Sequence, residues 1–298
     1  MTCRLLAAIV LFFGTASFAK DSVQRPPIYG LSHVRIRVIE FEEALSFYQN
    51  TLGLTPENLS CDISIGKCYR LNDEQIIQLH IVDSKPPQDL IEEIAFRTSD
   101  VSMMSKYLVA QGLHPEAIQK LAGSILSVAV TDPEGHRILF EQLPPSGETS
   151  HGRGISNRLI HTGFVSHDRA AEDHFYKDIL GFRPYWHGGM KDDQTDWVSL
   201  QVSDGTDWVE FMVNVSPNAD HHTLGVMNHI ALGVRDIHAA QKQLIANGWK
   251  PKEEPKLGRD GKWQLNLYDP DDTRVEFMEF TPTQKPCCSE FTAPHPKP

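Results

Sequence analysis

The amino-acid sequence predicts an α+β protein built from four βαβββ modules. These pair into two domains, each an open, curved mixed sheet cupping a site. One observation is an internal repeat, in which residues 31–38 (LSHVRIRV) correspond to residues 159–166 (LIHTGFVS), 128 positions later. A second repeat, in which residues 92–100 correspond to residues 228–236, alternates with the first along the chain. The length of 298 residues suits two domains of roughly 130 residues each.

The first and third modules begin near Ile28 and Arg158, and each has a helical stretch after its first strand. Both helical stretches carry a Phe-Tyr pair followed by Leu-Gly, in FYQNTLGL and FYKDILGF. Gly53 and Gly181 stand where a helix end favours a left-handed residue. They therefore predict the C-termini of two equivalent helices.

The second and fourth modules begin near Ile91 and Met227. Their first strands are similar to each other, EEIAFRTSD and NHIALGVRD, and the helices that follow end at Gly112 and Gly248. Each module then closes with an Asp-Pro turn, DPEG or DPDD, before a last strand. This alternation predicts that a first-type and a second-type module form each domain.

The amino-terminal residues predict a cleaved signal peptide. Arg4 precedes an apolar run at 5–13, which is too short to span a bilayer comfortably, and Ser17 and Ala19 fit the small-residue positions of a cleavage site before Lys20. We therefore expect an exported protein, periplasmic or secreted, with no membrane association after cleavage. The resulting boundaries are a signal peptide at 1–19, domain 1 at 28–143, a linker rich in Pro, Gly and Ser at 144–157, domain 2 at 158–281, and a Pro- and Cys-containing tail at 282–298.

The charge of the chain excludes one class of partner. The formal net charge is −11 and no basic stripe interrupts it, whereas nucleic-acid affinity comes largely from neutralising phosphates. We expect a small-molecule substrate and no nucleic acid. The chain is expected to be a monomer with an internal pseudo-dimer, or a homodimer.

Four cysteines remain once the signal peptide is removed, and an exported chain permits disulfides. Cys61 and Cys68 flank a predicted hairpin and either pair across it or stay free. Cys287 and Cys288 are adjacent in the tail, and we interpret them as separate or surface thiols, or as a link between chains, rather than as a bonded pair.

The chemistry is predicted in domain 2. The first strands of its two modules offer His161 and His229, and the last strands offer Glu210 and Glu276, so equivalent positions alternate His and Glu. Apolar neighbours flank both glutamates, and a charged residue in such a strand needs solvent, a partner or a metal. Two imidazoles and two carboxylates suit one divalent ion, which is zinc, nickel, iron, manganese or cobalt.

The pattern resembles the vicinal-oxygen-chelate superfamily, which includes glyoxalase I, methylmalonyl-CoA epimerase, fosfomycin- and bleomycin-resistance proteins and type I extradiol dioxygenases. Residues 228–236 and the ending DPDDTRVEF are especially similar to glyoxalase I. This resemblance implies lyase or isomerase chemistry through a metal-bound enediolate, on a small carbonyl or hydroxy substrate. Glu210 or Glu276 would leave the metal and act as the base.

Two alternatives remain. An extradiol-type dioxygenase with Fe(II) or Mn(II) would need only His161, His229 and Glu276, but Asn266 stands where that signature has a tyrosine, and the upstream histidine is missing. A non-catalytic binding or resistance protein would usually lack the metal set. His187, in a predicted loop, and Tyr268, near the last strand, are further candidates for the substrate pocket.

Domain 1 departs from the pattern, and we interpret it as degenerate. A site shifted by two residues, using His80 and Glu141, is an alternative. Another is a site shared between domains, using His33 and Gln78 with His229 and Glu276. The residues of domain 1 equivalent to the four ligands are His33, Gln78, Glu93 and Leu139.

Overall fold

The computed structural model describes residues 23–58, 64–84, 90–144 and 154–298. The predicted signal peptide, most of the predicted linker and Cys61 lie outside these residues. Cys68 is disulfide-bonded. Among the described residues, no helix has the length and apolar character needed to cross a bilayer.

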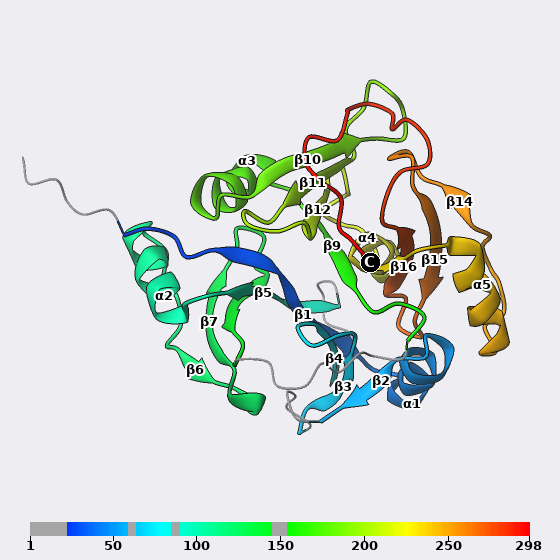
Figure 1. Ribbon diagram of the computed structural model, residues 1–298, viewed down its shortest axis with the longest axis horizontal. Coiled ribbons are helices and arrows are strands. Elements are labelled where there is room, and N and C mark those ends of the chain that lie inside the picture. Colours follow the sequence, from blue (N-terminus) through cyan, green and yellow to red (C-terminus); the bar gives the residue numbers. More distant parts are fainter. Residues whose placement is uncertain (1–22, 59–63, 85–89, 145–153) are drawn as a thin grey trace, which may run out of the picture.

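Domain 1 has one eight-stranded sheet with helices packed beside it (Figure 1). In chain order its elements are β1 (Ile28–Val38), α1 (Phe41–Leu45), the π-helical turn η1 (Ser46–Thr51), β2 (Thr55–Glu57), β3 (Gly66–Arg70), β4 (Ile76–Ile81), β5 (Ile91–Thr98), α2 (Val101–Ala110), β6 (Gln119–Lys120), the 3₁₀ turn η2 (Ala122–Ser124), β7 (Leu126–Thr131) and β8 (Arg137–Gln142).

Domain 2 repeats this plan and adds one helix before its second module. In chain order its elements are β9 (Leu159–Val165), α3 (Arg169–Asp173), the π-helical turn η3 (His174–Ile179), β10 (Arg183–Gly188), β11 (Trp197–Gln201), β12 (Trp208–Met212), α4 (His221–Met227), β13 (His229–Val234), α5 (Ile237–Ala246), β14 (Lys256–Leu257), β15 (Trp263–Tyr268) and β16 (Arg274–Glu279).

The predicted fold class is confirmed by the strand order. The sheets run β2-β3-β4-β1-β5-β8-β7-β6 and β10-β11-β12-β9-β13-β16-β15-β14, so each is two four-stranded modules joined edge to edge. The first strands of the two modules pair antiparallel at the centre, and each pairs in parallel with the last strand of its own module. Gly53 and Gly181 have positive φ angles of 69° and 72°, as the repeat predicts.

Two symmetrical contacts join the domains. The Tyr48 hydroxyl donates to the carboxylate of Asp269 in domain 2 over 3.1 Å, and the equivalent Tyr176 hydroxyl donates to Asp132 in domain 1 over 3.0 Å. All four side chains are buried. Because each tyrosine follows the first helix of one domain and each aspartate begins the Asp-Pro turn of the other, the pairing reproduces a two-fold interface within one chain.

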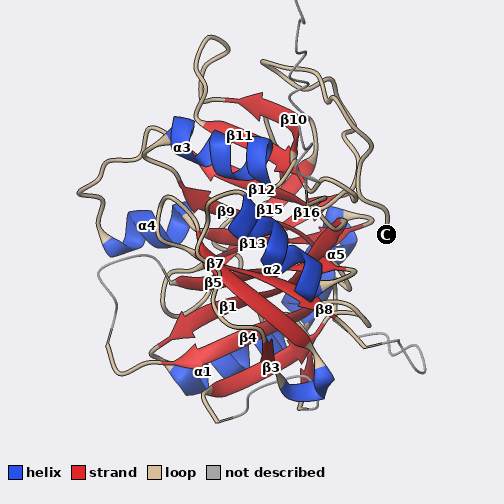
Figure 2. Cartoon of the chain, turned by 90° about the vertical axis from the view of Figure 1, so that its left-hand side faces the viewer, coloured by secondary structure: helices blue, strands red, loops and turns tan. Residues whose placement is uncertain are grey.

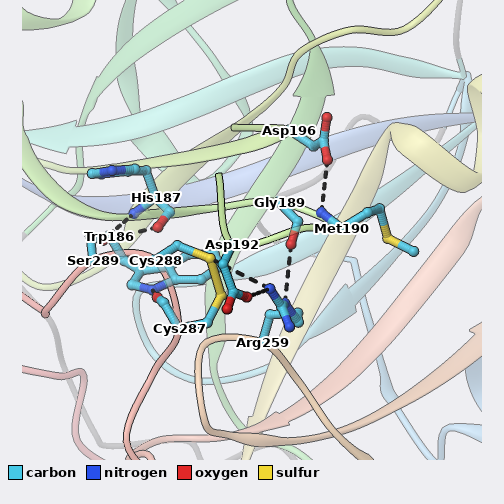
Figure 3. Close-up of a disulfide and its surroundings, with 10 residues drawn as sticks. All are labelled: Trp186, His187, Gly189, Met190, Asp192, Asp196, Arg259, Cys287, Cys288 and Ser289. Atoms are coloured by element: carbon cyan, nitrogen blue, oxygen red, sulfur yellow. Dashed lines mark hydrogen bonds and ion pairs between the residues drawn. A yellow bond between two sulfur atoms is a disulfide. The ribbon is translucent and has the colours of Figure 1, made fainter. Parts of the chain in front are cut away.

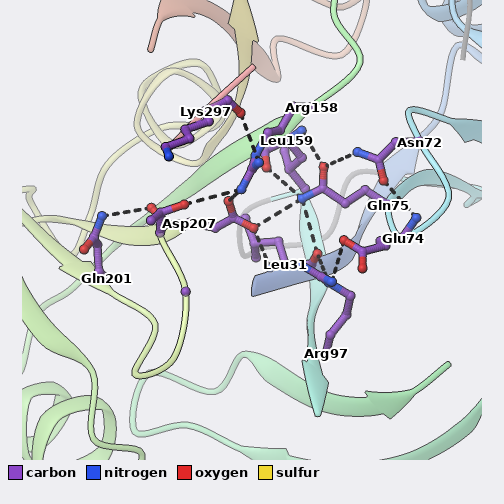
Figure 4. Close-up of polar contacts among 12 residues, drawn as sticks. Leu31, Asn72, Glu74, Gln75, Arg97, Arg158, Leu159, Gln201, Asp207 and Lys297 are labelled. Carbon is purple, nitrogen blue, oxygen red and sulfur yellow. Dashed lines mark hydrogen bonds and ion pairs between the residues drawn. The ribbon is translucent and has the colours of Figure 1, made fainter. Parts of the chain in front are cut away.

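A third polar contact lies at the seam between the two sheets (Figure 4). The carboxylate of Asp207, fully buried, accepts from the Leu31 backbone N–H over 3.0 Å and from Arg158 over 2.7 Å. The Gln75 side chain also reaches Asp207 and donates to the Leu159 carbonyl over 2.8 Å. These bonds satisfy a charge that would otherwise be costly to bury.

The carboxy-terminal segment, residues 281–298, returns over domain 2 and lies along β10 (Figures 1 and 2). The Thr292 N–H donates to the Tyr185 carbonyl over 3.1 Å, and Gln201 donates to the Pro294 carbonyl over 2.7 Å. The ring of Phe291 packs on Tyr185 with centroids 4.8 Å apart. The predicted tail is therefore part of the packed domain.

The interpretation of the two adjacent cysteines was wrong, because Cys287 and Cys288 form a disulfide with each other (Figure 3). The backbone N–H of Cys287 donates to the Arg259 carbonyl over 2.8 Å, and Trp186 Nε1 donates to the Cys287 carbonyl over 3.3 Å. These bonds hold the turn at Cys288, whose φ is 69°, so that both sulfurs stay side by side.

Candidate metal centre

Two histidines meet at the centre of the domain 2 sheet. His161 on β9 and His229 on β13 come from the antiparallel central strands, and their Nε2 atoms lie 3.0 Å apart. Gly163 is the partner of His229 in this register, and a Cβ at Gly163 would lie 1.9 Å from the His229 ring. The glycine therefore provides the space in which the His229 imidazole lies.

The two glutamates approach from the strands on either side. Glu210 on β12 has its Oε2 atom 3.6 Å from His229 Nε2. Glu276 on β16 has its Oε2 atom 3.6 Å from His161 Nε2 and 3.7 Å from His229 Nε2. The structure thus brings together all four side chains that the sequence singles out.

Neighbouring groups hold these side chains in place. His229 Nδ1 lies 2.9 Å from the Met227 carbonyl and 2.8 Å from Arg274 Nη2, and these two contacts orient the ring so that Nε2 faces the site. The Trp208 ring stacks on the His161 imidazole with centroids 4.6 Å apart. The Ser199 hydroxyl donates to Glu210 Oε1 over 3.3 Å, so the other oxygen of this carboxylate faces the histidines.

The electrostatics of this group fit a bound cation. Burial raises the pKa of Glu210 to about 8, with the charge of Glu276 as the next cause, and burial raises the pKa of Glu276 to about 7. Burial also lowers the pKa of both imidazoles, which keeps them neutral. Two neutral imidazole nitrogens and two carboxylates that repel each other form a donor set that a divalent ion would satisfy.

A cavity of about 320 Å³ adjoins the four side chains. Glu210 and Glu276 line it, together with Asn266 and Arg274, and half of the other lining residues are aromatic or methionine. The aromatic and methionine residues of this wall are Tyr185, Trp186, Met190, Trp197, Trp208, Met212, Met278 and Phe291. A largely apolar pocket with a few convergent polar groups is typical of a site for a small molecule.

Lys262 and Phe291 are among the lining residues that sequence reasoning missed. Lys262 follows an Asp-Gly turn, and Phe291 stands in a polar tail, so neither carries a local signal of burial. Burial lowers the pKa of Lys262 to about 8, although the charges of Asp260, Glu276 and Glu210 oppose that shift.

The two pocket candidates named from the sequence lie elsewhere. His187 is exposed, and its backbone N–H donates to Ser289 Oγ over 2.9 Å. The Tyr268 hydroxyl donates to Glu253 over 3.0 Å. Neither side chain lines the cavity beside the four candidate ligands.

The equivalent place in domain 1 holds an ion-pair cluster. His33 Nε2 lies 2.9 Å from Glu93 and His33 Nδ1 lies 3.3 Å from Glu141, while Arg35 pairs with Glu93 over 2.6 Å. Arg137 also pairs with Glu93, over 2.5 Å. The structure therefore gives His33 carboxylate partners within its own domain.

The alternative arrangements in domain 1 are not assembled. His80 pairs with Glu92 over 2.5 Å, away from Glu141, which binds His33 and Ser32. Gln78 accepts from Arg35 over 3.0 Å rather than facing His229. Leu139 contributes a small apolar cluster with Ala95 and Ala129.

Comparison with known proteins gives the same family over both domains. Residues 30–140 and 158–277 each match the family described as the Glyoxalase/Bleomycin resistance protein/Dioxygenase superfamily. A lactoylglutathione lyase of Haemophilus influenzae is 27% identical over 124 residues, which cover 41% of this chain and 92% of that protein.

Solved structures share the fold at low sequence identity. The 2,3-dioxygenase LapB from Pseudomonas sp. KL28 has a TM-score of 0.66 at 18% identity, covering 92% of this chain and 96% of that one. The Mn(II)-bound glyoxalase from Novosphingobium aromaticivorans has a TM-score of 0.66 at 16% identity, covering 85% and 83%.

Proposed function

Because the chain belongs to the Glyoxalase/Bleomycin resistance protein/Dioxygenase superfamily, we propose that domain 2 is a metal-dependent, glyoxalase-like lyase or isomerase. Its substrate is a small carbonyl or hydroxy compound. His161, Glu210, His229 and Glu276 would hold one divalent ion: zinc, nickel, iron, manganese or cobalt. The convergence of two imidazoles with two carboxylates is the observation that carries this proposal.

A bound divalent ion would polarise the substrate carbonyl and so acidify the neighbouring carbon. Glu210 is suited to accept that proton, because one of its oxygens is held by Ser199 while the other faces the site. Returning the proton to the adjoining carbon completes an isomerisation without any external oxidant. The aromatic walls of the cavity would limit the access of water.

The similarity to a lactoylglutathione lyase supports this reaction class. We also propose that the chain is exported, which favours a substrate smaller than glutathione or coenzyme A conjugates, since these are scarce outside the cytoplasm. A ring-cleaving dioxygenase is the second candidate, favoured by the aromatic lining of the cavity. Against it, Asn266 lines the cavity where that signature has a tyrosine, and the hydroxyl of Tyr268 is bound to Glu253.

The test begins with metal analysis of the purified mature chain by mass spectrometry, after loading with each of the five metals. NMR then follows the incorporation of deuterium from D2O at carbon in two substrates, the methylglyoxal hemithioacetals of glutathione and of mercaptoethanol. Oxygen uptake is measured in parallel with catechols. One metal per chain with carbon-bound exchange is expected, and oxygen uptake without exchange would instead support the dioxygenase.

The variant Glu210→Gln sharpens this test. The amide oxygen can still ligate a metal but is a poor base, so we expect retained metal and a loss of about 10²–10⁴-fold in exchange rate. His174→Asn is a matched control, because the His174 side chain is exposed and pairs only with the exposed Asp178. Unchanged exchange in Glu210→Gln would contradict the role assigned to Glu210, and an absence of bound metal would contradict the whole proposal.

A further inference from the structure

Lys262 is a buried, charged side chain in the domain 2 site that forms no ion pair with another described residue. Its relative exposure is 0%, and none of the ion pairs between described residues includes it. Its Nζ has one hydrogen-bond acceptor among these residues, the Tyr185 hydroxyl, at 3.4 Å. An ammonium has three N–H donors, and burying it beside a single neutral acceptor is costly.

Aromatic rings surround this ammonium. Nζ lies 4.5 Å from the centroid of Trp208, 5.1 Å from that of Phe291 and 5.4 Å from that of Tyr185. The faces of such rings attract a cation but leave its N–H donors without acceptors. Trp208 also stacks on His161, so the cage adjoins the candidate metal ligands.

The nearest acidic side chains are engaged elsewhere. Asp260 Oδ1 accepts from the backbone N–H of Lys262 over 3.1 Å and from Gln264 over 3.3 Å, which directs this oxygen to the turn, and Asp260 forms no ion pair with the Lys262 ammonium among the described residues. Glu210 and Glu276 face the two histidines. The open side of Lys262 is therefore the cavity that it lines.

The walls of the cavity indicate the rest of the ligand. Trp186 and Trp197 lie nearly parallel, with an interplanar angle of 15° and centroids 6.5 Å apart, and Phe291 of the carboxy-terminal segment closes another side. Four cationic side chains line the cavity, Lys256, Arg259, Lys262 and Arg274, and Lys262 is the one that is fully buried. This positive charge beside flat apolar walls fits a planar organic anion.

We propose that Lys262 is a substrate-contacting residue that binds an anionic oxygen, so that the domain 2 site takes small organic acids with a flat apolar body. This inference deepens the proposed function and rests on the same cavity. The hydroxyl of Tyr185 positions the ammonium, and His295 lies 2.5 Å from that hydroxyl, which fixes its orientation from the tail.

The test compares benzoate with benzamide, two probes of nearly the same shape that differ in charge. Binding to the zinc-loaded mature chain is measured by calorimetry for wild type, Lys262→Met and Lys262→Arg. We expect wild type to prefer benzoate, and Lys262→Met to weaken benzoate binding by about 10–100-fold while benzamide changes little. Lys262→Arg should restore part of the preference because it keeps the charge.

Metal content separates this proposal from the previous one. Each variant is analysed for zinc, and binding is repeated with metal-free protein. A wild-type chain that takes up no metal would contradict the proposed function, while a benzoate preference lost in Lys262→Met would still support the lysine. Equal benzoate binding in wild type and Lys262→Met, or no preference of wild type for benzoate over benzamide, would overturn the assignment of Lys262.

Discussion

Besides the changed ligand positions, the centres of the two domains differ at a neighbouring register position, where domain 2 has Gly163 and domain 1 has Arg35. In domain 2, Gly163 pairs with His229 and leaves room for its imidazole. In domain 1, Arg35 pairs with Glu93, and its guanidinium contacts both Glu93 and Gln78, the equivalents of two candidate ligands. A side chain thus supplies a fixed positive charge where domain 2 has a donor set for a cation.

The comparison shows that the same fold accommodates a different polar centre in each domain. A buried carboxylate still needs a cation, and Glu93 has His33, Arg35 and Arg137 around it. Burial alone would raise the pKa of Glu93. The hydrogen bond from His33 and then the charges of these three groups outweigh burial and lower the pKa of Glu93 to about 2. The polar centre of domain 1 is therefore satisfied from within the chain.

The largest expected effect comes from removing the space at Gly163. In Gly163→Ala, the added Cβ would lie 1.9 Å from the His229 ring, so the imidazole must move away from the other ligands. We expect metal content to fall to a small fraction and any turnover to fall about 100-fold or more. Mass spectrometry of the metal and the exchange assay measure both.

Gly112→Ala is the control for this prediction. At Gly112 the φ of 84° makes an alanine unfavourable, but no atom lies within 4 Å of the added Cβ, so nothing has to move. It should lower stability while the metal content stays at the wild-type level. Full metal occupancy in Gly163→Ala would show that the space at this glycine is not what distinguishes the two centres.

The next effect tests the cation cluster of domain 1. Glu93→Gln leaves His33, Arg35 and Arg137 without their shared carboxylate, and breaking a buried ion pair in this way costs about 3–5 kcal/mol in unfolding free energy. Urea unfolding measures the loss. Glu116→Gln is the control, because Glu116 pairs with Arg137 at the surface and such pairs contribute about 0–1 kcal/mol.

Domain 2 provides the second control for Glu93→Gln. Its metal content should stay at the wild-type level, because none of the four candidate ligands contacts Glu93 in the described structure. Equal losses in Glu93→Gln and Glu116→Gln would refute the idea that the buried carboxylate organises domain 1.

The smallest effect is the pH dependence of the same cluster. Burial alone would lower the pKa of His33. The charge and hydrogen bond of Glu141, and then those of Glu93, outweigh burial and raise this pKa from 6.5 to about 9. A raised histidine pKa stabilises the folded state below pH 6.5, and this contribution is lost as the pH rises from 6.5 to 9. The lowered pKa of Glu93 stabilises the folded state above pH 4.5, and this contribution is lost as the pH falls from 4.5 toward 2.

The unfolding free energies of wild type and His33→Gln should therefore differ most between pH 4.5 and 6.5, and the difference should shrink as the pH rises to 9. His174→Asn serves again as the control, because that imidazole is largely exposed. A difference that grows above pH 6.5 would show that His33 is not held as a cation.

The sequence predicted the fold and the four converging side chains for one reason, which is repetition. Equivalent strands carry His161 and His229, and the pairing of modules brings equivalent strand positions to one centre. The family is confirmed over both domains. No comparable pattern indicates Lys262, whose environment depends on Trp208 and on a ring contributed by the tail.

Two other features depend on contacts that a local pattern does not carry. The disulfide between Cys287 and Cys288 is one of these features. It lies in a turn, and hydrogen bonds with Arg259 and Trp186 hold that turn in place. The contact of His33 with Glu141 is the other, because Glu141 lies two residues beyond the ligand-equivalent position on the last strand of domain 1. Tertiary packing rather than spacing in the sequence determines both.

The returning carboxy-terminal segment has a consequence for how the protein is made and handled. Because Phe291 closes the cavity and His295 holds Tyr185, the pocket is incomplete until residues 281–298 have been synthesised and have docked on domain 2. Without this segment, Tyr185 would lose its contacts with Phe291 and His295, and the cavity would lose one wall.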